Sequence, residues 1–285
     1  MSADRRIFVV RLTGMDETGW MRSQALHFLC DLLEVLAFLG RPTLANAIHG
    51  SRYWGRPGVG DRDLVDLGKR GYLELEPGVR NRKDRVLRLT EKGRLRAMGG
   101  RDPEACWSRP WDGRWRMVLF DIPEKDRRIR AVLRRSLAAA HFGYLQNSVW
   151  VSPDPLDFER RIFKGTVINA ESLLTLDAVP GTGERDSDIV CGAWDFRAIN
   201  RSYGEHIQIL NELPPPGEWA AGRGKSPLRH WIEAEREAWR DAVAGDPLLP
   251  RALHPPGYLG EKAWKLRSKQ IEKIARNLSQ LANGE

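Results

Sequence analysis

The chain has 285 residues, 41% of them hydrophobic, and a formal net charge of +8 from 46 Lys and Arg against 38 Asp and Glu. This length exceeds that of a usual single domain and the apolar content is enough for ordinary cores, so disordered and fibrous classes are excluded. No apolar run approaches the roughly 18 residues of a membrane span or forms a signal-peptide core, and Cys30, Cys106 and Cys191 lack a partner at metal-site spacing, so we expect a cytoplasmic protein with no membrane contact, disulfide or zinc site.

After an N-terminal arm at residues 1–23, residues 24–100 are predicted to form a winged helix-turn-helix domain. Helix patterns and stop signals define three helices, and two short β-patterned runs follow, with a turn-rich basic segment between them. The helices are expected at 24–39, 43–48 and 61–71, and the strands at 72–75 and 85–89. Thr90 begins a further helix.

Most of the net positive charge lies in this region, because residues 41–96 hold 14 Lys and Arg against 7 Asp and Glu. A local basic excess is expected of a module that binds the phosphates of double-stranded DNA. A helix fits the major groove, and a basic hairpin can reach the neighbouring backbone. The expected DNA-binding residues are Arg52 and Arg56 in the turn, Arg62, Lys69 and Arg70 on the third helix, and Arg80, Arg82, Lys83 and Arg85 at the hairpin.

Residues 111–180 are predicted to form a ferredoxin-like βαββαβ domain. Trp115 to Phe120 is a short apolar run typical of a buried strand, and a helix with a basic outer face follows it to about Ala140. We expect Gly143 to end this helix in a left-handed conformation. Tyr144 to Val151 then forms two strands if it bends, and the domain closes with a helix after Pro155 and a strand at 172–176.

The C-terminal domain, residues 190–285, is predicted to be mostly helical. The segments 96–110 and 180–187 are interpreted as linkers because Gly, Pro or charged residues interrupt any apolar period. Helical patterns cover 193–210, 228–243 and 264–281. The 11 Trp are best explained by packing in cores and interfaces. The whole chain is therefore expected to be an α+β multidomain protein.

Three motifs of the central stretch carry a resemblance to a known family. The sequence W-D-G-x-W at Trp111, the strand ending in D-I-P-E at Asp121, and L-Q-x-S-V-W-V-S-P from Leu145 resemble the central domain of the PaaX family, bacterial regulators of phenylacetate catabolism. The signatures D-P-x-L-P-x-x-L at Asp246 and G-x-x-A at Gly260 are similar to the C-terminal domain of that family. The central stretch also resembles the ferredoxin-like fold of the CRISPR adaptation endoribonucleases.

The PaaX resemblance implies a dimeric transcriptional repressor that is released from DNA by an aryl-acyl-CoA such as phenylacetyl-CoA. Homodimers suit operators with two half-sites about one helical turn apart. The seam between the central and C-terminal domains is the expected effector site. The third helix departs from the family pattern, because Asp61, Asp63 and Asp66 place acidic groups on it. We therefore expect the turn and hairpin to carry more of the affinity for DNA.

The endoribonuclease resemblance implies an alternative, a metal-dependent nuclease that uses Asp121 from each of two subunits. One carboxylate per chain is a weak Mg²⁺ site, and the competing interpretation is an Asp that accepts backbone hydrogen bonds in its own turn. The six His are scattered without metal-ligand or nucleophile spacing, and a phosphate-binding glycine loop is missing. The sequence therefore predicts a protein that is not an enzyme and holds no cofactor or metal.

Overall fold

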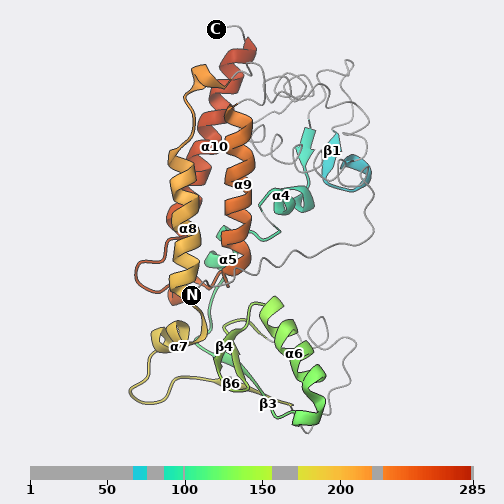
Figure 1. Ribbon diagram of the computed structural model, residues 1–285, viewed down its shortest axis with the longest axis vertical. Coiled ribbons are helices and arrows are strands. Elements are labelled where there is room, and N and C mark those ends of the chain that lie inside the picture. The colour runs from blue at the N-terminus through green and yellow to red at the C-terminus, as the bar shows by residue number, and fades with distance from the viewer. Residues whose placement is uncertain (1–66, 76–86, 99, 156–172, 220–226, 284–285) are drawn as a thin grey trace, which may run out of the picture. The chain divides into compact units, whose positions relative to one another are not determined.

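The computed structural model describes residues 67–75, 87–98, 100–155, 173–219 and 227–283 (Figure 1). The chain divides into two compact units. The first takes Met1–Ala97 and Ile274–Glu285, and the second takes Met98–Lys273. The predicted arm, the first two helices and the tip of the hairpin lie outside the described residues.

In the first unit, the end of a helix at residues 67–69 leads into a two-stranded antiparallel sheet. Its strands are β1 (Leu73–Leu75) and β2 (Leu87–Leu89), with Leu73 opposite Leu89, and α4 (Glu91–Ala97) follows. This confirms the predicted order of helix end, paired strands and following helix. Because the earlier helices are not described, the winged helix-turn-helix assignment stays a prediction.

The second unit contains a four-stranded antiparallel sheet in the order β4-β5-β3-β6. Its strands are β4 (Gly143–Gln146), β5 (Val149–Ser152), β3 (Trp115–Phe120) and β6 (Leu173–Ala178). The bend predicted within Tyr144 to Val151 is the turn at Asn147, whose φ is 46°. The second helix of the expected βαββαβ order would fall in residues 156–172, so the ferredoxin-like assignment is also still a prediction.

Each face of this sheet packs on a different element. The helix α6 (Arg127–Ala139) places Leu133 and Leu137 against Val118 and Phe120 on one face. The other face carries Trp115 and Val151, which pack with Val190 and Ala193 of α7 (Asp186–Ala193). Figure 1 shows α6 and α7 on either side of the strands.

Gly143 has a different role from the one predicted. The left-handed residue after α6 is His141, with a φ of 63°, whereas Gly143 is the first residue of β4. A Cβ atom on Gly143 would lie 2.6 Å from the Cβ atom of Ala193 and from the ring of Trp194. Glycine is needed here because the first strand residue runs directly against α7 and the segment after it.

The W-D-G-x-W motif forms a tight entry to the sheet. Gly113 has a φ of 77°, and the Asp112 carboxylate accepts hydrogen bonds from the backbone N–H of Arg114 at 3.1 Å and from the guanidinium of Arg116 at 2.5 Å. This hydrogen bond with Asp112 raises the pKa of Arg116, whose side chain is almost fully buried in β3. The motif therefore supplies the carboxylate that pairs with the buried guanidinium of Arg116 near the start of β3.

The rest of the second unit is helical, which confirms the prediction of a mostly helical region for residues 190–285. It contains α5 (Pro103–Ser108), α7, α8 (Phe196–Asn211), α9 (Pro227–Gly245) and most of α10 (Gly260–Asn283), with short 3-10 turns at Glu124–Asp126, Pro216–Glu218 and Arg251–Leu253. Trp107, Tyr203 and Trp239 lie in the main core of this region, and Trp107, Trp115, Trp219 and Trp239 are fully buried. The packing role predicted for the Trp residues is confirmed for these four.

Both predicted linkers were wrong in part. The segment 96–110 contains α5, and 180–187 contains the first residues of α7. In α5, Asp102 caps the helix by accepting from the N–H of Ala105 at 3.2 Å, and Trp107 is 1% exposed. A segment with such a core residue is part of the domain rather than a tether.

Candidate nucleic-acid interface

The described part of the predicted DNA-binding region is the junction between the helix end and the hairpin. Leu67 is buried, and its carbonyl accepts the N–H of Tyr72 at 2.9 Å. Gly71 turns the chain with a φ of 71°, which lets the helix stop and β1 begin within a few residues. The buried Leu67 fixes the inner face of this helix, so its neighbours Lys69 and Arg70 lie on the outside, where both are exposed.

Thr90 ties the far end of the hairpin to this turn. Its hydroxyl donates to the carbonyl of Gly71 at 2.6 Å and accepts from the N–H of Gly93 at 3.0 Å, so one side chain both caps α4 and holds the helix end. The Thr90 N–H also donates to the carbonyl of Tyr72 at 3.1 Å. The base of the hairpin is therefore fixed to the helix before it and the helix after it.

Lys92 makes a second hydrogen bond to the helix end and adds a positive charge beside Lys69 and Arg70. Its Nζ donates to the carbonyl of Arg70 at 2.7 Å and lies 4.7 Å from the ring centroid of Tyr72. A cation at the carbonyl end of a helix is electrostatically favourable. Lys69, Arg70 and Lys92 thus place positive charge on one short stretch of surface, which suits contact with phosphate oxygens.

The structure reaches only two of the nine predicted DNA-binding residues. Lys69 and Arg70 are exposed side by side at the end of the helix, and their contact with DNA stays a prediction. Outside the described residues lie Arg52, Arg56, Arg62, Arg80, Arg82, Lys83 and Arg85. Lys92 was missed because it stands beyond the hairpin in sequence, and only the Thr90 tie brings it next to Arg70.

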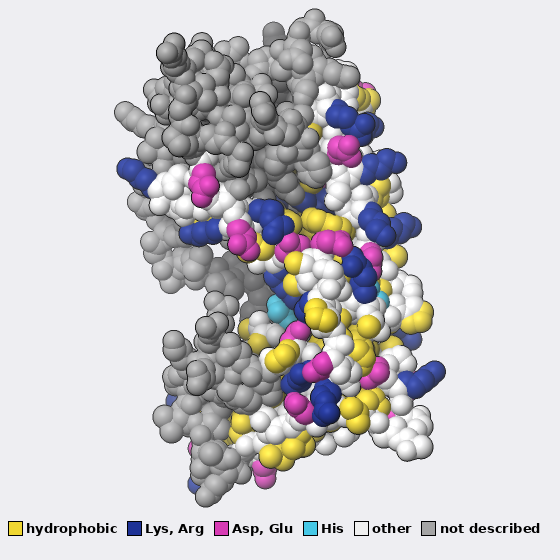
Figure 2. All heavy atoms as spheres, turned by 180° about the vertical axis from the view of Figure 1, so that it is seen from behind, with side chains coloured by type: hydrophobic (Ala, Val, Ile, Leu, Met, Phe, Trp, Pro, Cys, Tyr) yellow, Lys and Arg dark blue, Asp and Glu magenta, His cyan; other side chains and the backbone are white. Residues whose placement is uncertain are grey.

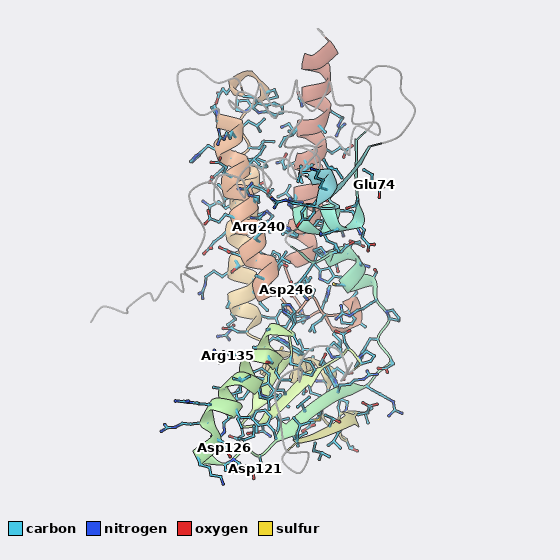
Figure 3. The ribbon with its side chains drawn as sticks, turned by 90° about the vertical axis from the view of Figure 1, so that its right-hand side faces the viewer. Glu74, Asp121, Asp126, Arg135, Arg240 and Asp246 are labelled. Carbon is cyan, nitrogen blue, oxygen red and sulfur yellow. The ribbon has the colours of Figure 1, made fainter. Side chains whose placement is uncertain are left out.

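Asp121 follows β3 and is exposed, at the same end of α6 as Asp126 (Figure 3). Among the described residues its carboxylate accepts no hydrogen bond, so the predicted backbone bonds within its turn are not found. The described part of the chain also holds no group of three or more His, Cys, Asp or Glu that could bind a metal ion. The nuclease alternative needs Asp121 from two subunits, and it stays a prediction.

The seam between the sheet and the C-terminal helices, expected to bind the effector, holds two arginines that already have partners. Arg101 donates to the carbonyls of Val243 and Pro247, the first at 3.3 Å and the second at 2.8 Å, and to that of Asp246. Burial lowers the pKa of Arg101. Arg109 pairs with Asp154, with an Nε to Oδ1 distance of 2.6 Å.

Since these guanidinium groups hydrogen-bond to protein carbonyls or to a carboxylate, they hold the seam together in this structure. A ligand phosphate would have to displace those bonds or use other cations. Sequence reasoning placed both arginines in a linker, although Asp102-Pro103 is a helix-start signal that could have corrected this.

Next to Arg101 lies a buried carboxylate with several donors. Asp246 is 1% exposed, and its Oδ2 accepts from the hydroxyls of Tyr203, at 2.6 Å, and Tyr258, while its Oδ1 accepts from the N–H of Leu248 at 2.8 Å. Burial raises the pKa of Asp246, and burial followed by the Asp246 charge raises the pKa values of both tyrosines. This cluster fixes the D-P-L-L-P turn and leaves Asp246 no exposed edge for chemistry.

A buried ion pair network lies farther along the same helices. Glu235 of α9 accepts from the Nε of Arg267 at 2.8 Å and lies 2.9 Å from the Nε2 of His206. Burial acts to raise the pKa of Glu235, but the charge of Arg267 and the His206 bond more than offset it and lower the pKa. The three residues link α8, α9 and α10, so their role is structural.

Two comparisons with known proteins agree with the fold and motifs. Residues 108–188 match the family described as PaaX protein central Cas2-like domain. Over 219 residues, 75% of this chain and 64% of the relative, the chain is 25% identical to the transcriptional repressor PaaX of Escherichia coli strain K12. The matched part is thus slightly less than two thirds of the length of that relative.

A solved structure, uncharacterized protein Rv0674 from Mycobacterium tuberculosis, is similar with a TM-score of 0.51 and 23% identity, over 87% of this chain and 95% of that one. This likeness concerns the fold alone. Among the described residues, no helix is both long and apolar enough to cross a membrane. The resemblance predicted from residues 111–153 is confirmed, because residues 108–188 match the model of the PaaX central Cas2-like domain and the chain is similar to a PaaX repressor.

Proposed function

We propose that this protein is a transcriptional repressor that binds double-stranded DNA through residues 24–100 and performs no catalysis. The observation that carries the proposal is its similarity to a transcriptional repressor over 75% of the chain. The helix end with exposed Lys69 and Arg70, joined to a paired hairpin, supports it. In this arrangement the helix enters the major groove and the hairpin tip contacts the neighbouring backbone.

In the proposed mechanism, the base and the tip of the hairpin contact different phosphates of the duplex. Lys69, Arg70 and Lys92 contact phosphates beside the groove, and the tip residues Arg82 and Lys83 reach farther along the duplex. Two heads in a homodimer would read two half-sites, which raises the affinity for a symmetric operator. The four-stranded sheet domain is the proposed dimerisation unit.

An aryl-acyl-CoA such as phenylacetyl-CoA is the proposed effector. To release DNA, it must bind more tightly to the conformation with lower affinity for DNA. The proposed site is the seam around Arg101 and Arg109, where breaking carbonyl hydrogen bonds to bind phosphates would alter how the helices pack on the sheet. This links effector binding to a change in domain packing.

The test begins with genome-wide recovery of fragments bound to the full-length protein, followed by titration of a recovered duplex at several salt concentrations. Arg82→Ala with Lys83→Ala should flatten the slope of log K against log salt by roughly 0.9 for each lost phosphate contact. As a control, Arg197→Ala with Arg201→Ala removes two exposed charges from α8, and should leave the slope unchanged. Absence of any salt-dependent duplex binding would refute the proposed function.

The effector is tested with the same complex. Phenylacetyl-CoA should lower the affinity for the recovered duplex, whereas free CoA at equal concentration should not. Release by both compounds would indicate simple competition by phosphate groups. Cleavage of the duplex with Mg²⁺ that is lost in Asp121→Ala would instead support the nuclease alternative.

A further inference from the structure

The outer face of α6 carries a cluster of arginines that lies outside the proposed DNA-binding region, residues 24–100. The helix has the sequence RRIRAVLRRSLAA, with five Arg and no acidic residue. Arg127, Arg128, Arg134 and Arg135 are exposed, whereas Arg130 is partly buried and donates to the carbonyl of Ile122. In Figure 3 side chains with nitrogen tips extend from α6, where Arg135 is labelled, away from the strands.

The four exposed arginines form two pairs on one face. Arg127 and Arg134, like Arg128 and Arg135, are seven residues apart, which is two helical turns and about 10 Å along the axis. The exposed residues between and beyond the pairs include Ala131 and Ala138, whose small side chains do not project as far as the arginines. The outcome is a shallow strip with two positive charges at each end.

These charges are not neutralised within the part of the chain that the structure describes. Arg134 donates only to the carbonyl of Asn147 at 3.4 Å and Arg135 only to that of Ala131 at 3.3 Å, and Arg127 and Arg128 have no partner among the described residues. Arg197 and Arg201 of α8 also have no side-chain partner among the described residues, whereas three other arginines are neutralised. Arg185, Arg229 and Arg251 each form an ion pair with a carboxylate, and on the face shown in Figure 2 the Lys and Arg side chains are interspersed with Asp and Glu.

Clustering of positive charge lowers the stability of α6. Arg127 and Arg128 stand in the first turn, where the exposed N–H groups already carry partial positive charge and a cation is unfavourable. Within α6, like charges also stand three and four residues apart, which weakens a helix further. An external polyanion that binds this face would remove both effects.

We propose that the outer face of α6 is a second DNA-contact surface, which binds duplex phosphates without reading sequence. This inference rests on the proposed DNA-binding function and adds the central domain to the interface. Guanidinium groups suit phosphate oxygens because they donate two parallel hydrogen bonds. The phosphates of one strand recur about every 3.4 Å along the duplex axis, so a strip about 10 Å long spans roughly three of them, and the four arginines reach further phosphates only on the other strand.

The experiment compares two full-length variants that each lose four positive charges. In the α6 variant, Arg127, Arg128, Arg134 and Arg135 are replaced by Gln, which keeps helix propensity. In the control, Arg197→Gln, Arg201→Gln, Lys262→Gln and Lys269→Gln change exposed positions of α8 and α10. The probes are a recovered duplex and a scrambled duplex of the same length and composition.

The α6 variant should flatten the slope of log K against log salt by up to about 3.6, at roughly 0.9 per contact, and should weaken binding to both duplexes by the same factor. The control should change neither. Two half-variants, Arg127→Gln with Arg128→Gln and Arg134→Gln with Arg135→Gln, should each give about half the effect. They replace the full variant if its circular dichroism shows loss of helix.

The outcomes separate the two proposals. If the unaltered protein binds no duplex, the proposed function fails, and the α6 contact fails with it. If the unaltered protein binds and the α6 variant keeps the full slope, only the α6 contact is refuted, and an acidic protein becomes the better partner for this face. Equal losses in the α6 variant and the control would show a general charge effect and would also overturn the inference.

Discussion

The buried carboxylate of Asp246 gives the most direct test of how the C-terminal region is held together. Asp246→Ala removes the acceptor for the Tyr203 and Tyr258 hydroxyls and for the Leu248 N–H, and of these residues Tyr203 and Leu248 are 0% exposed. Each buried donor left without a partner costs about 1–3 kcal/mol, so the two cost about 2–6 kcal/mol. Because burial raises the pKa of Asp246, removing its carboxyl group recovers part of this cost, and we expect a net loss of about 2–4 kcal/mol.

The measurement is the free energy of unfolding from urea titration, followed by tryptophan fluorescence, since Trp107 and Trp239 lie in the same core as Tyr203. Asp241→Ala is the matched control, because Asp241 is an exposed residue of the same helix, α9. Its effect should stay within about 0.5 kcal/mol. A loss for Asp246→Ala no larger than that of the control would refute the reasoning.

A double-mutant cycle identifies the hydrogen bond itself. Tyr203→Phe alone should cost about 1 kcal/mol, because it removes one donor and leaves Asp246 with Tyr258 and Leu248. In the Asp246→Ala background the same change should cost less, since the hydroxyl has already lost its acceptor. Additive effects would mean that the two groups do not interact as described.

Three further predictions concern other parts of the second unit. Burial, followed by the charge of Arg101, lowers the pKa of His141 to about 4. Below pH ~6.5 the unfolded chain therefore binds a proton on His141 that the folded chain does not bind. We expect the free energy of unfolding to fall as the pH is lowered from 6.5 toward 4. His141→Asn, which tolerates the φ of 63°, should make unfolding free energies measured at pH 6.5 and 5 more nearly equal. Glu235→Gln should lower the unfolding free energy by about 3–5 kcal/mol, since it leaves Arg267 buried without its carboxylate, and a loss under about 1 kcal/mol would contradict this. Gly143→Ala should cost about 1–3 kcal/mol by overpacking, whereas Gly181→Ala, with no atom within 4 Å of the added Cβ, should leave the urea midpoint almost unchanged.

Local patterns predicted the elements whose apolar faces repeat over many residues. The strand at Trp115 to Phe120 has the predicted bounds, and α8, α9 and α10 lie where helical spacing placed them. The short helix α7 was missed because it is only eight residues long and packs against the sheet through Val190 and Ala193 at its end. A single helical turn of apolar contacts does not produce a period that a sequence window can detect.

Long-range contacts account for the rest of the differences. Glu235 and Arg267 are 32 residues apart, and Arg101 and Pro247 are 146 apart, so their pairing depends on how the helices pack. The role of Gly143 depends on Trp194, which comes close only when α7 is in place. In the candidate interface, the positions of Lys69 and Arg70 could be predicted from one helix, whereas the contribution of Lys92 required the tie through Thr90.

The hydrogen bonds of Thr90 and Lys92 bear on how the helix end and the hairpin can move. Thr90 and Lys92 join the base of the hairpin to the end of the helix, so we expect the two elements to move together. If the proposed function holds, an effector that lowers the affinity for DNA would move the helix end and the hairpin together, and the DNA contacts of both would be lost in one step.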